Sequence, residues 1–249
     1  MYTKQINFLC ALPRTGATFL GSVINQSKQI QMTGNSIVPE IFSNILKIKD
    51  SDVFNNFPYH AGIDRILLNV FNHYYQNLEH PNILDKAPWG TPFNLTLLKC
   101  LFEKRKFVIL ERPVLECLAS LVKAKTNKQS IREFCKFMMD KEQGILGKNL
   151  WSIQNIITQN EQHIIISYND LVNDTQKQID KIFEFLELER EVFDLNNLKQ
   201  FQFDNVQYND TEASGNYHTI RVDNIKKINY KVEEYLPKEI INQYKDIKI

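Results

Sequence analysis

The sequence predicts an α/β fold in three layers, with a mostly parallel central sheet flanked by helices. Short, continuous apolar runs alternate with segments of helical periodicity, and such runs are typical of strands buried on both faces. Strands that are separated by helices form parallel sheets with right-handed crossovers. The chain has 249 residues and no visible internal repeat. We therefore expect one domain over residues 1–249.

The expected strands are the apolar runs. Ile6–Leu12 (INFLCAL) and Phe107–Leu110 (FVIL) are uninterrupted, whereas Ile83–Asp85 is shorter and ends at Lys86. Ile164–Ser167 is the fourth expected strand. Ligands of parallel sheets bind at the carboxyl ends of the strands. Residues that directly follow these runs are therefore the candidates for a functional site.

Helices are expected between the strands. Two of them begin with proline, whose missing N–H is tolerated in a first turn. Another opens with the capping box Ser130–Glu133 (SIRE). The last one carries its apolar side chains on a single stripe. The expected helices are 18–24, 92–102, 113–125, one long helix from 130 towards Ile157, and 175–188.

Composition excludes several classes of protein. The 30 Lys and Arg residues nearly balance the 29 Asp and Glu residues, which argues against nucleic-acid binding through bulk charge. No apolar run reaches the roughly 18 residues that a membrane span needs. The four cysteines are scattered without metal-ligand spacing, at Cys10, Cys100, Cys117 and Cys135. We expect a cytoplasmic protein that binds neither nucleic acid nor membrane and holds no metal.

The first candidate motif is the strand-turn-helix at Leu12–Thr18. Gly16 lets the backbone turn tightly before a helix starts, so several N–H groups point at one spot and the helix dipole favours an anion there. Arg14 adds a permanent charge with a fork of donors, and Thr15 and Thr18 add hydroxyls. The motif predicts a P-loop-like site for phosphate or sulfate. An ordinary turn with a capping Thr is the alternative. The Walker pattern with its Lys is absent.

The second candidate motif is Glu111–Ser120 (ERPVLECLAS), which follows the strand at 107–110. Arg112 stands at the carboxyl end of this strand, and Ser120 lies two helical turns further on. Taken alone, the pair is equally well explained as a surface Arg and a helix Ser. Its weight comes from the presence of a second strand-turn-helix unit with an Arg in the same chain.

These motifs resemble those of a known family. PRTGATFL is similar to the 5′-phosphosulfate loop of sulfotransferases that use 3′-phosphoadenosine 5′-phosphosulfate (PAPS), and ERPVLECLAS is similar to their 3′-phosphate motif. The Arg-type loop is closer to the tyrosylprotein and carbohydrate branches than to the cytosolic phenol-type enzymes. The resemblance covers about residues 5–125 and continues more weakly over 164–188.

The resemblance implies a nucleotide site. Backbone N–H groups of residues 15–18, with the Arg14 and Thr18 side chains, would bind the 5′-phosphosulfate. Arg112 and Ser120 would bind the 3′-phosphate, and Tyr168 would lie near the adenine. Lys231 matches a carboxyl-terminal Lys that covers the nucleotide, although it is equally well read as a solvated helix residue. The expected nucleotide-binding residues are Arg14, Thr15, Gly16, Ala17, Thr18, Phe19, Arg112, Ser120, Tyr168, Arg221 and Lys231.

The resemblance also implies catalytic roles. Arg14 and Lys86 would stabilise the charge on the leaving phosphate, and Lys86 is the possible proton donor because a guanidinium does not deprotonate. The general base is open. Asn35 and Ser36 stand where an acidic residue is expected, and Glu40 lies one turn further on. The alternatives to Glu40 are His60, His73 and His218.

Residues 204–224 are polar and lack periodicity, so we expect a loop or lid there. Its His218 and Arg221 would close over the nucleotide or the acceptor. The predicted function is transfer of a sulfuryl group from PAPS to a hydroxyl or amine, which gives adenosine 3′,5′-bisphosphate (PAP). The acceptor is a small molecule, a carbohydrate or a peptide. A nucleotide kinase or other phosphoryl transferase, and a non-catalytic nucleotide-binding protein, are the alternatives.

Overall fold

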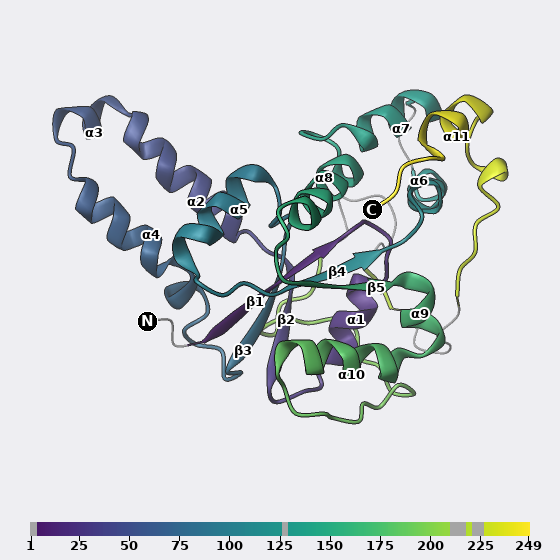
Figure 1. Cartoon of the computed structure of the whole chain (residues 1–249), viewed down its shortest axis with the longest axis horizontal. Coiled ribbons are helices and arrows are strands. Elements are labelled where there is room, and N and C mark those ends of the chain that lie inside the picture. Colours follow the sequence, from purple (N-terminus) through teal and green to yellow (C-terminus); the bar gives the residue numbers. More distant parts are fainter. Residues whose placement is uncertain (1–3, 126–128, 210–217, 221–226) are drawn as a thin grey trace.

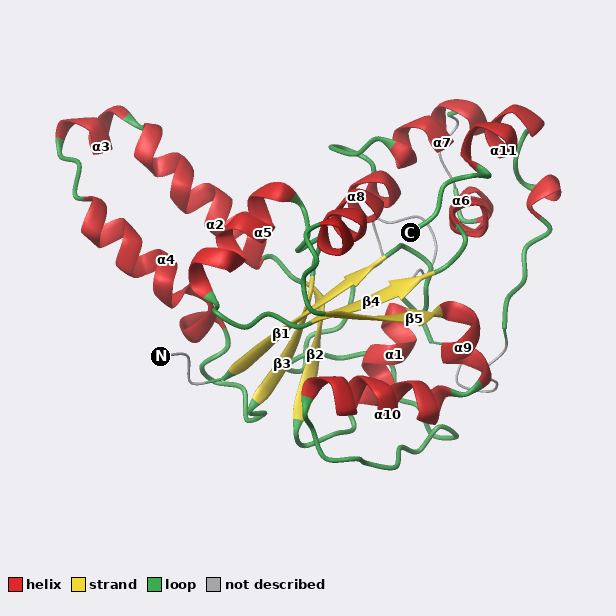
Figure 2. Ribbon diagram, in the orientation of Figure 1, coloured by secondary structure: helices red, strands yellow, loops and turns green. Residues whose placement is uncertain are grey.

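The computed structural model describes residues 4–125, 129–209, 218–220 and 227–249. Its centre is a sheet of five strands whose neighbours all pair in parallel, which confirms the α/β prediction (Figure 2). The strands are β1 (Gln5–Ala11), β2 (Ile30–Asn35), β3 (Asn82–Lys86), β4 (Phe107–Glu111) and β5 (His163–Ser167). The strand order is β2-β3-β1-β4-β5, so β1 lies in the middle of the sheet.

Helices cover both faces of the sheet and make the two outer layers (Figure 1). Strand β1 shows why, because alternate side chains enter different cores. Phe8 and Cys10 pack into one core, and Leu9 and Ala11 into the other. The first core includes α5 (Pro92–Leu101), α6 (Val114–Lys123), α7 (Ile131–Met139), α8 (Ile145–Thr158) and α11 (Lys238–Tyr244). The second core includes α1 (Ala17–Ile24), α9 (Tyr168–Asn173) and α10 (Thr175–Leu186).

A helical arm projects from the body of the molecule between β2 and β3 (Figure 1). It consists of α2 (Val38–Lys47), the 3-10 turn η1 (Ile48–Asp50), α3 (Asp52–Asn56) and α4 (His60–Tyr74). Phe42 and Phe71 anchor its base in the first core. The sequence pattern indicates a helix start near Glu40 and a helix face at Phe71 and Tyr74, but it does not delimit these helices, so the arm as a unit is a finding of the structure.

The structure differs from the sequence prediction at two further places. It contains strand β2, which the sequence does not predict because Ile30–Asn35 (IQMTGN) is a mixed polar segment rather than an apolar run. The single long helix from 130 towards Ile157 is wrong, since α7 and α8 are separate helices. Asp140 is extended at the end of α7, and Gly144 caps α8 in an extended conformation. A Cβ at Gly144 would stand 2.1 Å from the carbonyl oxygen of Phe137, so this close turn requires glycine.

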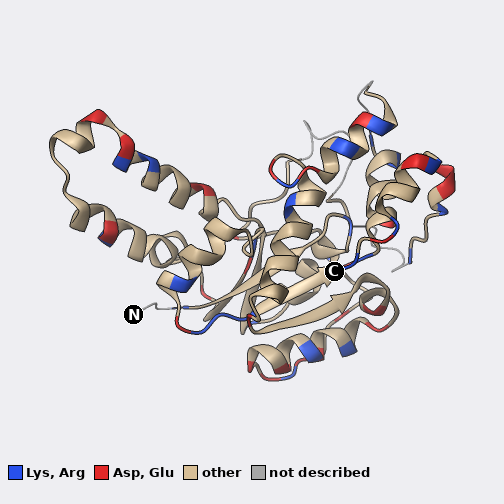
Figure 3. Ribbon diagram, turned by 45° about the horizontal axis from the view of Figure 1, so that its top comes forward, with Lys and Arg blue, Asp and Glu red and all other residues tan. Residues whose placement is uncertain are grey.

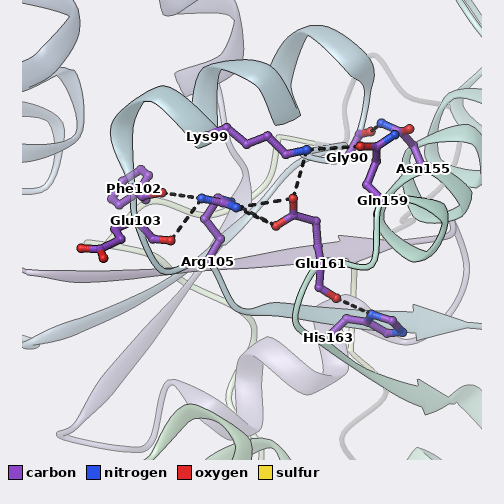
Figure 4. A network of polar contacts seen from close by, with 9 residues as sticks. All are labelled: Gly90, Lys99, Phe102, Glu103, Arg105, Asn155, Gln159, Glu161 and His163. Atoms are coloured by element: carbon purple, nitrogen blue, oxygen red, sulfur yellow. Dashed lines mark hydrogen bonds and ion pairs between the residues drawn. The ribbon is translucent and has the colours of Figure 1, made fainter.

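An ion-pair network joins the amino ends of β4 and β5 (Figure 4). The buried carboxylate of Glu161 pairs with Arg105 at 3.0 Å and with Lys99 at 3.3 Å. Arg105 also donates to the carbonyl oxygens of the turn that follows α5. This network lies at the end of the sheet opposite the candidate ligand residues, and it ties the turn before β4 to the turn before β5.

Basic and acidic residues are interspersed along the helices in Figure 3, in keeping with the formal net charge of +1. Of the expected loop or lid at 204–224, the structure describes residues 204–209 and 218–220. Arg221 lies outside the described residues. In the described part of the chain, no helix is long and apolar enough to cross a membrane.

Candidate functional site

The loop between β1 and α1 has the backbone that the sequence predicted for an anion site. Arg14 and Gly16 both adopt positive φ, at 69° and 79°, and Gly16 caps α1. Gly16 makes no side-chain cap hydrogen bond, and the first N–H groups of a helix have no partner within the helix. A φ of 79° directly before the helix start strongly favours glycine, which explains Gly16.

The side chains of this loop have different environments. The Thr15 hydroxyl is buried and donates to the carbonyl oxygen of Leu12 at 2.7 Å, so it braces the loop from inside. Ala17 is buried, whereas Thr18 and Phe19 are half-buried. Of the two threonine hydroxyls of the loop, at Thr15 and Thr18, that of Thr18 is therefore the more accessible.

Arg112, after β4, is a buried cation. Its side chain is only 3% exposed, and Nε and Nη2 both donate to Oε2 of Glu116, at 3.0 and 2.9 Å. Nη1 donates to the carbonyl oxygen of Arg14 at 3.0 Å, and Nη2 also donates to that of Ile228. The guanidinium lies 4.0 Å from the centre of the Tyr168 ring. A desolvated guanidinium held this way is fixed in position.

The two motifs meet through Ser120. Nε of Arg14 donates to the Ser120 hydroxyl at 3.0 Å, across 106 residues of sequence. The Ser120 hydroxyl donates in turn to the phenol oxygen of Tyr230 at 3.1 Å. The structure therefore brings Arg14, Arg112, Ser120 and Tyr168 together at the carboxyl ends of β1, β4 and β5.

Three residues of this cluster were missed by sequence reasoning. Glu116 lies on α6 and orients Arg112. Its position four residues after Arg112 is the sequence signal that could have indicated this ion pair. Tyr230 and Ile228 come from a segment that crosses the cluster, where the Ile228 N–H also donates to the Tyr168 hydroxyl at 3.2 Å. Nothing in the local sequence pattern marks those two positions.

Lys86 ends β3, the strand on the other side of β1. Its ammonium group donates to the side-chain oxygen of Asn35 at the end of β2, at 2.7 Å. Desolvation lowers the pKa of Lys86 to about 8. This ammonium group can therefore lose or regain its proton close to neutral pH.

The remaining predicted residues come from three other segments of the chain, and Lys231 directly follows Tyr230 of the cluster. Glu40 is exposed in the first turn of α2. The His218 ring stacks on Tyr208 with centroids 3.6 Å apart, and Tyr208 packs against Gly34 near the end of β2. Lys231 is exposed and pairs with Glu234 at 3.7 Å.

The two alternative histidines lie on α4. His60 begins this helix next to α3, at the outer part of the arm, and packs edge-on against Phe54. His73 is exposed, and its Nδ1 lies 3.5 Å from Oε1 of Gln76. Neither histidine comes with a described contact to the arginine cluster.

A buried carboxylate next to Lys86 was also missed. Asp85 is fully buried and accepts hydrogen bonds from Ser36 at 3.0 Å, from Trp89 at 3.1 Å and from the Tyr75 hydroxyl. Burial raises the pKa of Asp85 to about 6, against the lowering effect of these donors. The sequence signal that could have indicated this buried carboxylate is the acidic residue at the end of the apolar run Ile83–Asp85.

A cavity of about 370 Å³ opens at the carboxyl ends of β4 and β5. Arg112, Tyr168 and Asn169 line it, together with residues 247–249 at the end of the chain. A separate open groove of about 650 Å³ lies between α2 and α4 of the arm. The described residues contain no group of three or more His, Cys, Asp and Glu side chains that could hold a metal.

An all-parallel sheet with a glycine turn and two arginines at its carboxyl edge is typical of α/β proteins that bind anionic ligands. A model of the sulfotransferase domain matches residues 5–247, and the chain belongs to this family of transferases. The family match supports sulfuryl transfer and gives no support to the phosphoryl-transfer alternative. No curated protein sequence matched the chain.

Solved structures with a similar fold include a mouse sulfotransferase, SULT7A1, in complex with PAP. It is 13% identical, covers 99% of this chain and 83% of its own, and has a TM-score of 0.57. The sulfotransferase domain of the Synechococcus PCC 7002 olefin synthase is 16% identical, with coverages of 100% and 90% and a TM-score of 0.52.

A sulfotransferase from Alicyclobacillus acidocaldarius is 13% identical, with coverages of 76% and 83% and a TM-score of 0.51. At these identities the likeness shows the fold. The closer resemblance to the tyrosylprotein and carbohydrate branches stays a prediction.

Proposed function

We propose that this protein transfers the sulfuryl group of PAPS to a hydroxyl or amine of an acceptor and releases PAP. The observation that carries the proposal is the contact between the two anion motifs. Arg14 of the first motif donates to Ser120 of the second, and Arg112 of the second donates to the backbone of the first. Two separate anion sites joined in this way fit a ligand with two phosphate positions.

The first anion site is the loop before α1. The backbone N–H groups of residues 15–18, the half-buried Thr18 hydroxyl and the Arg14 guanidinium would hold the 5′-phosphosulfate. Arg14 remains charged at every working pH, so it stabilises the leaving phosphate without exchanging a proton. Gly16 keeps the loop in the shape that aims those N–H groups.

The second anion site is formed by Arg112 and Ser120. Glu116 and the Tyr168 ring hold the guanidinium in place, so the 3′-phosphate meets an ordered donor group. The 370 Å³ cavity beside Tyr168 has the size of a small-molecule site and would take the adenosine. PAP in complex with SULT7A1, which has the same fold, supports this choice of nucleotide.

Lys86 is the second cation of the proposed reaction. Sulfuryl transfer resembles phosphoryl transfer in that the protein mainly positions the reactants and stabilises charge. A protonated Lys86 would stabilise the charge that builds on the leaving phosphate, and its lowered pKa suits a proton donor. Glu40 and His218 stay candidates for the residue that accepts the acceptor's proton.

Calorimetric titration with PAP, and with ATP and ADP for comparison, tests the proposal. We expect PAP to bind without Mg²⁺ and an Arg112→Ala variant to bind about 10- to 100-fold more weakly, because charged hydrogen bonds contribute roughly 1.5–3 kcal/mol. Arg132→Ala is the matched control, since Arg132 is exposed and pairs with Glu239. Mg²⁺-dependent binding of ATP without binding of PAP would overturn the proposal in favour of phosphoryl transfer.

A further inference from the structure

The order of the strands divides the candidate site into two halves. The arginine cluster lies at β1, β4 and β5, whereas β3 and β2 continue the sheet on the other side of β1. Neighbouring strands are about 4.8 Å apart, so the end of β2 lies roughly 10 Å from the anion loop. In an in-line transfer the acceptor enters opposite the leaving phosphate. With the nucleotide on the first half, the β3 and β2 side of the sheet edge is left for the acceptor.

This second half holds a carboxylate that has no role in binding the nucleotide. Asp85 is 0% exposed, and three side chains donate to its two oxygens. Hydrogen bonds from three donors favour the ionised form of a carboxylate, against the effect of its burial. Asp85 is therefore a buried titratable carboxyl at the end of β3, one residue before Lys86.

Ser36 connects this buried carboxylate to the surface of the site. It directly follows β2 and is half-buried, and its N–H donates to the carbonyl oxygen of Lys86 at 2.9 Å. The Ser36 hydroxyl donates to Asp85 at 3.0 Å and accepts from the Val38 N–H at 3.2 Å. The Tyr75 hydroxyl also lies in hydrogen-bond contact with Ser36, but it donates its proton to Asp85. Since a hydroxyl oxygen has two lone pairs and the Val38 N–H occupies one, the other can receive a proton from an acceptor group.

We propose that Ser36 and Asp85 form a proton relay that takes the proton from an acceptor hydroxyl. The relay rests on the proposed sulfuryl transfer. As the acceptor oxygen bonds to sulfur, its proton moves to Oγ of Ser36, and the Ser36 proton moves to Oδ2 of Asp85. The bond between sulfur and the bridging oxygen breaks, and its electron pair leaves with the phosphate. Ser36 ends the step as a neutral hydroxyl, and Asp85 ends it as a neutral acid that later returns its proton to water.

Among the groups that surround Asp85, Asp85 itself is the one that changes its charge near pH 6. Tyr74 and Tyr75 face it from the end of α4, and Cys10 faces it from β1, and each has a raised pKa and stays neutral. The other two donors, Ser36 and Trp89, do not ionise in this range. Lys86, the next residue, stays charged up to a pH of about 8. From pH 5 to about pH 7 Asp85 is therefore the group within this network whose charge changes.

The test uses water as the smallest hydroxyl acceptor, so that it does not depend on knowing the natural one. Sulfate release from ³⁵S-labelled PAPS is followed in single turnovers with enzyme in excess, from pH 5 to pH 8. We expect Ser36→Ala and Asp85→Asn to lower the rate about 10²- to 10⁴-fold, the usual range for acid–base catalysis. Affinity for PAP stays unchanged, because neither residue contacts the nucleotide half.

Two further variants separate a relay from a structural role. Ser36→Thr keeps the hydroxyl and is expected to retain activity, while Asp64→Asn removes an exposed carboxylate of the arm and serves as the control. The wild-type rate rises with pH as Asp85 ionises, and this rise disappears in Asp85→Asn.

Wild-type rates and an unchanged pH profile in both Ser36→Ala and Asp85→Asn, with PAP still bound, would overturn the relay alone. PAP binding without any sulfate release from the wild-type enzyme would also overturn it, because the relay must activate the smallest acceptor. Failure of wild-type protein to bind PAP would instead overturn the proposed function on which the relay rests.

Discussion

The unfolding free energy of an Asp85→Asn variant, compared with that of the wild-type protein, should increase as the pH rises. In the fold the pKa of Asp85 is about 6, whereas the ordinary value is 3.8. Between these values the folded chain binds a proton that the unfolded chain has lost, so the contribution of Asp85 to stability falls with rising pH. This contribution is fully present below pH 3.8 and is lost as the pH passes 6. From pH 4.5 to pH 7.5 the loss amounts to about 2 kcal/mol.

The amide of Asn carries no charge, so Asp85→Asn removes this dependence while keeping the volume of the side chain. The measurement is urea unfolding of both proteins at several pH values between 4.5 and 7.5, followed by tryptophan fluorescence. The difference in unfolding free energy between variant and wild type cancels the other titrating groups, and it should shift in favour of the variant by about 2 kcal/mol over this range. A difference that stays constant with pH would mean that Asp85 titrates at its ordinary pKa, and would refute the reasoning.

Three further predictions concern single residues. Because Lys86 loses its charge above a pH of about 8, sulfuryl transfer should decline through that pH in a rate profile. Lys86→Arg keeps a charge but cannot donate a proton, so it should remove this decline and leave a slower rate; a decline that persists at the same pH in the variant would contradict this. Gly16→Ala places a Cβ at a φ of 79°, which costs about 1–2 kcal/mol. If the loop shifts to relieve this strain, calorimetry should show PAP binding weakened about 5- to 30-fold, and if it does not shift, thermal melting should show lost stability. No change in either measurement would contradict the left-handed conformation of Gly16. Gly144→Ala should lower the unfolding free energy, because its Cβ would meet the Phe137 carbonyl at 2.1 Å, and a melting temperature equal to that of wild type would contradict this.

The predicted part of the fold is the part in which local sequence and burial agree. The strands β1 and β4 are buried on both faces and read as apolar runs, so their ends, with Arg14 and Arg112, could be located from the sequence. Strand β2 lies at the edge of the sheet and ends in Gly34 and Asn35, so it carries no such run. The break between α7 and α8 depends on a close backbone approach at Gly144, which periodicity does not reveal.

The candidate site divides in the same way. A motif in one segment marks Arg112 and Ser120, whereas the Asp85 network joins residues that are 49 and 10 positions apart. The contact between Ser36 and Asp85 arises because β2 lies beside β3, and the contact between Tyr75 and Asp85 arises because the end of α4 packs next to β3. Tyr230 likewise reaches Ser120 across 110 residues. Only the folded chain brings these groups into contact.

The two halves of the sheet edge stabilise charge in opposite ways. Arg112 is buried, but Glu116, two carbonyl oxygens and aromatic rings compensate its charge, and a guanidinium stays protonated throughout the working range. Asp85 and Lys86 are destabilised as ions by burial, so their pKa values of about 6 and about 8 approach each other around neutrality. Groups that bind phosphate need a permanent charge, whereas groups that exchange protons need a pKa near the working pH. Permanent charge at β1 and β4, beside titrating charge at β3, therefore points to nucleotide binding on one side of β1 and proton exchange on the other.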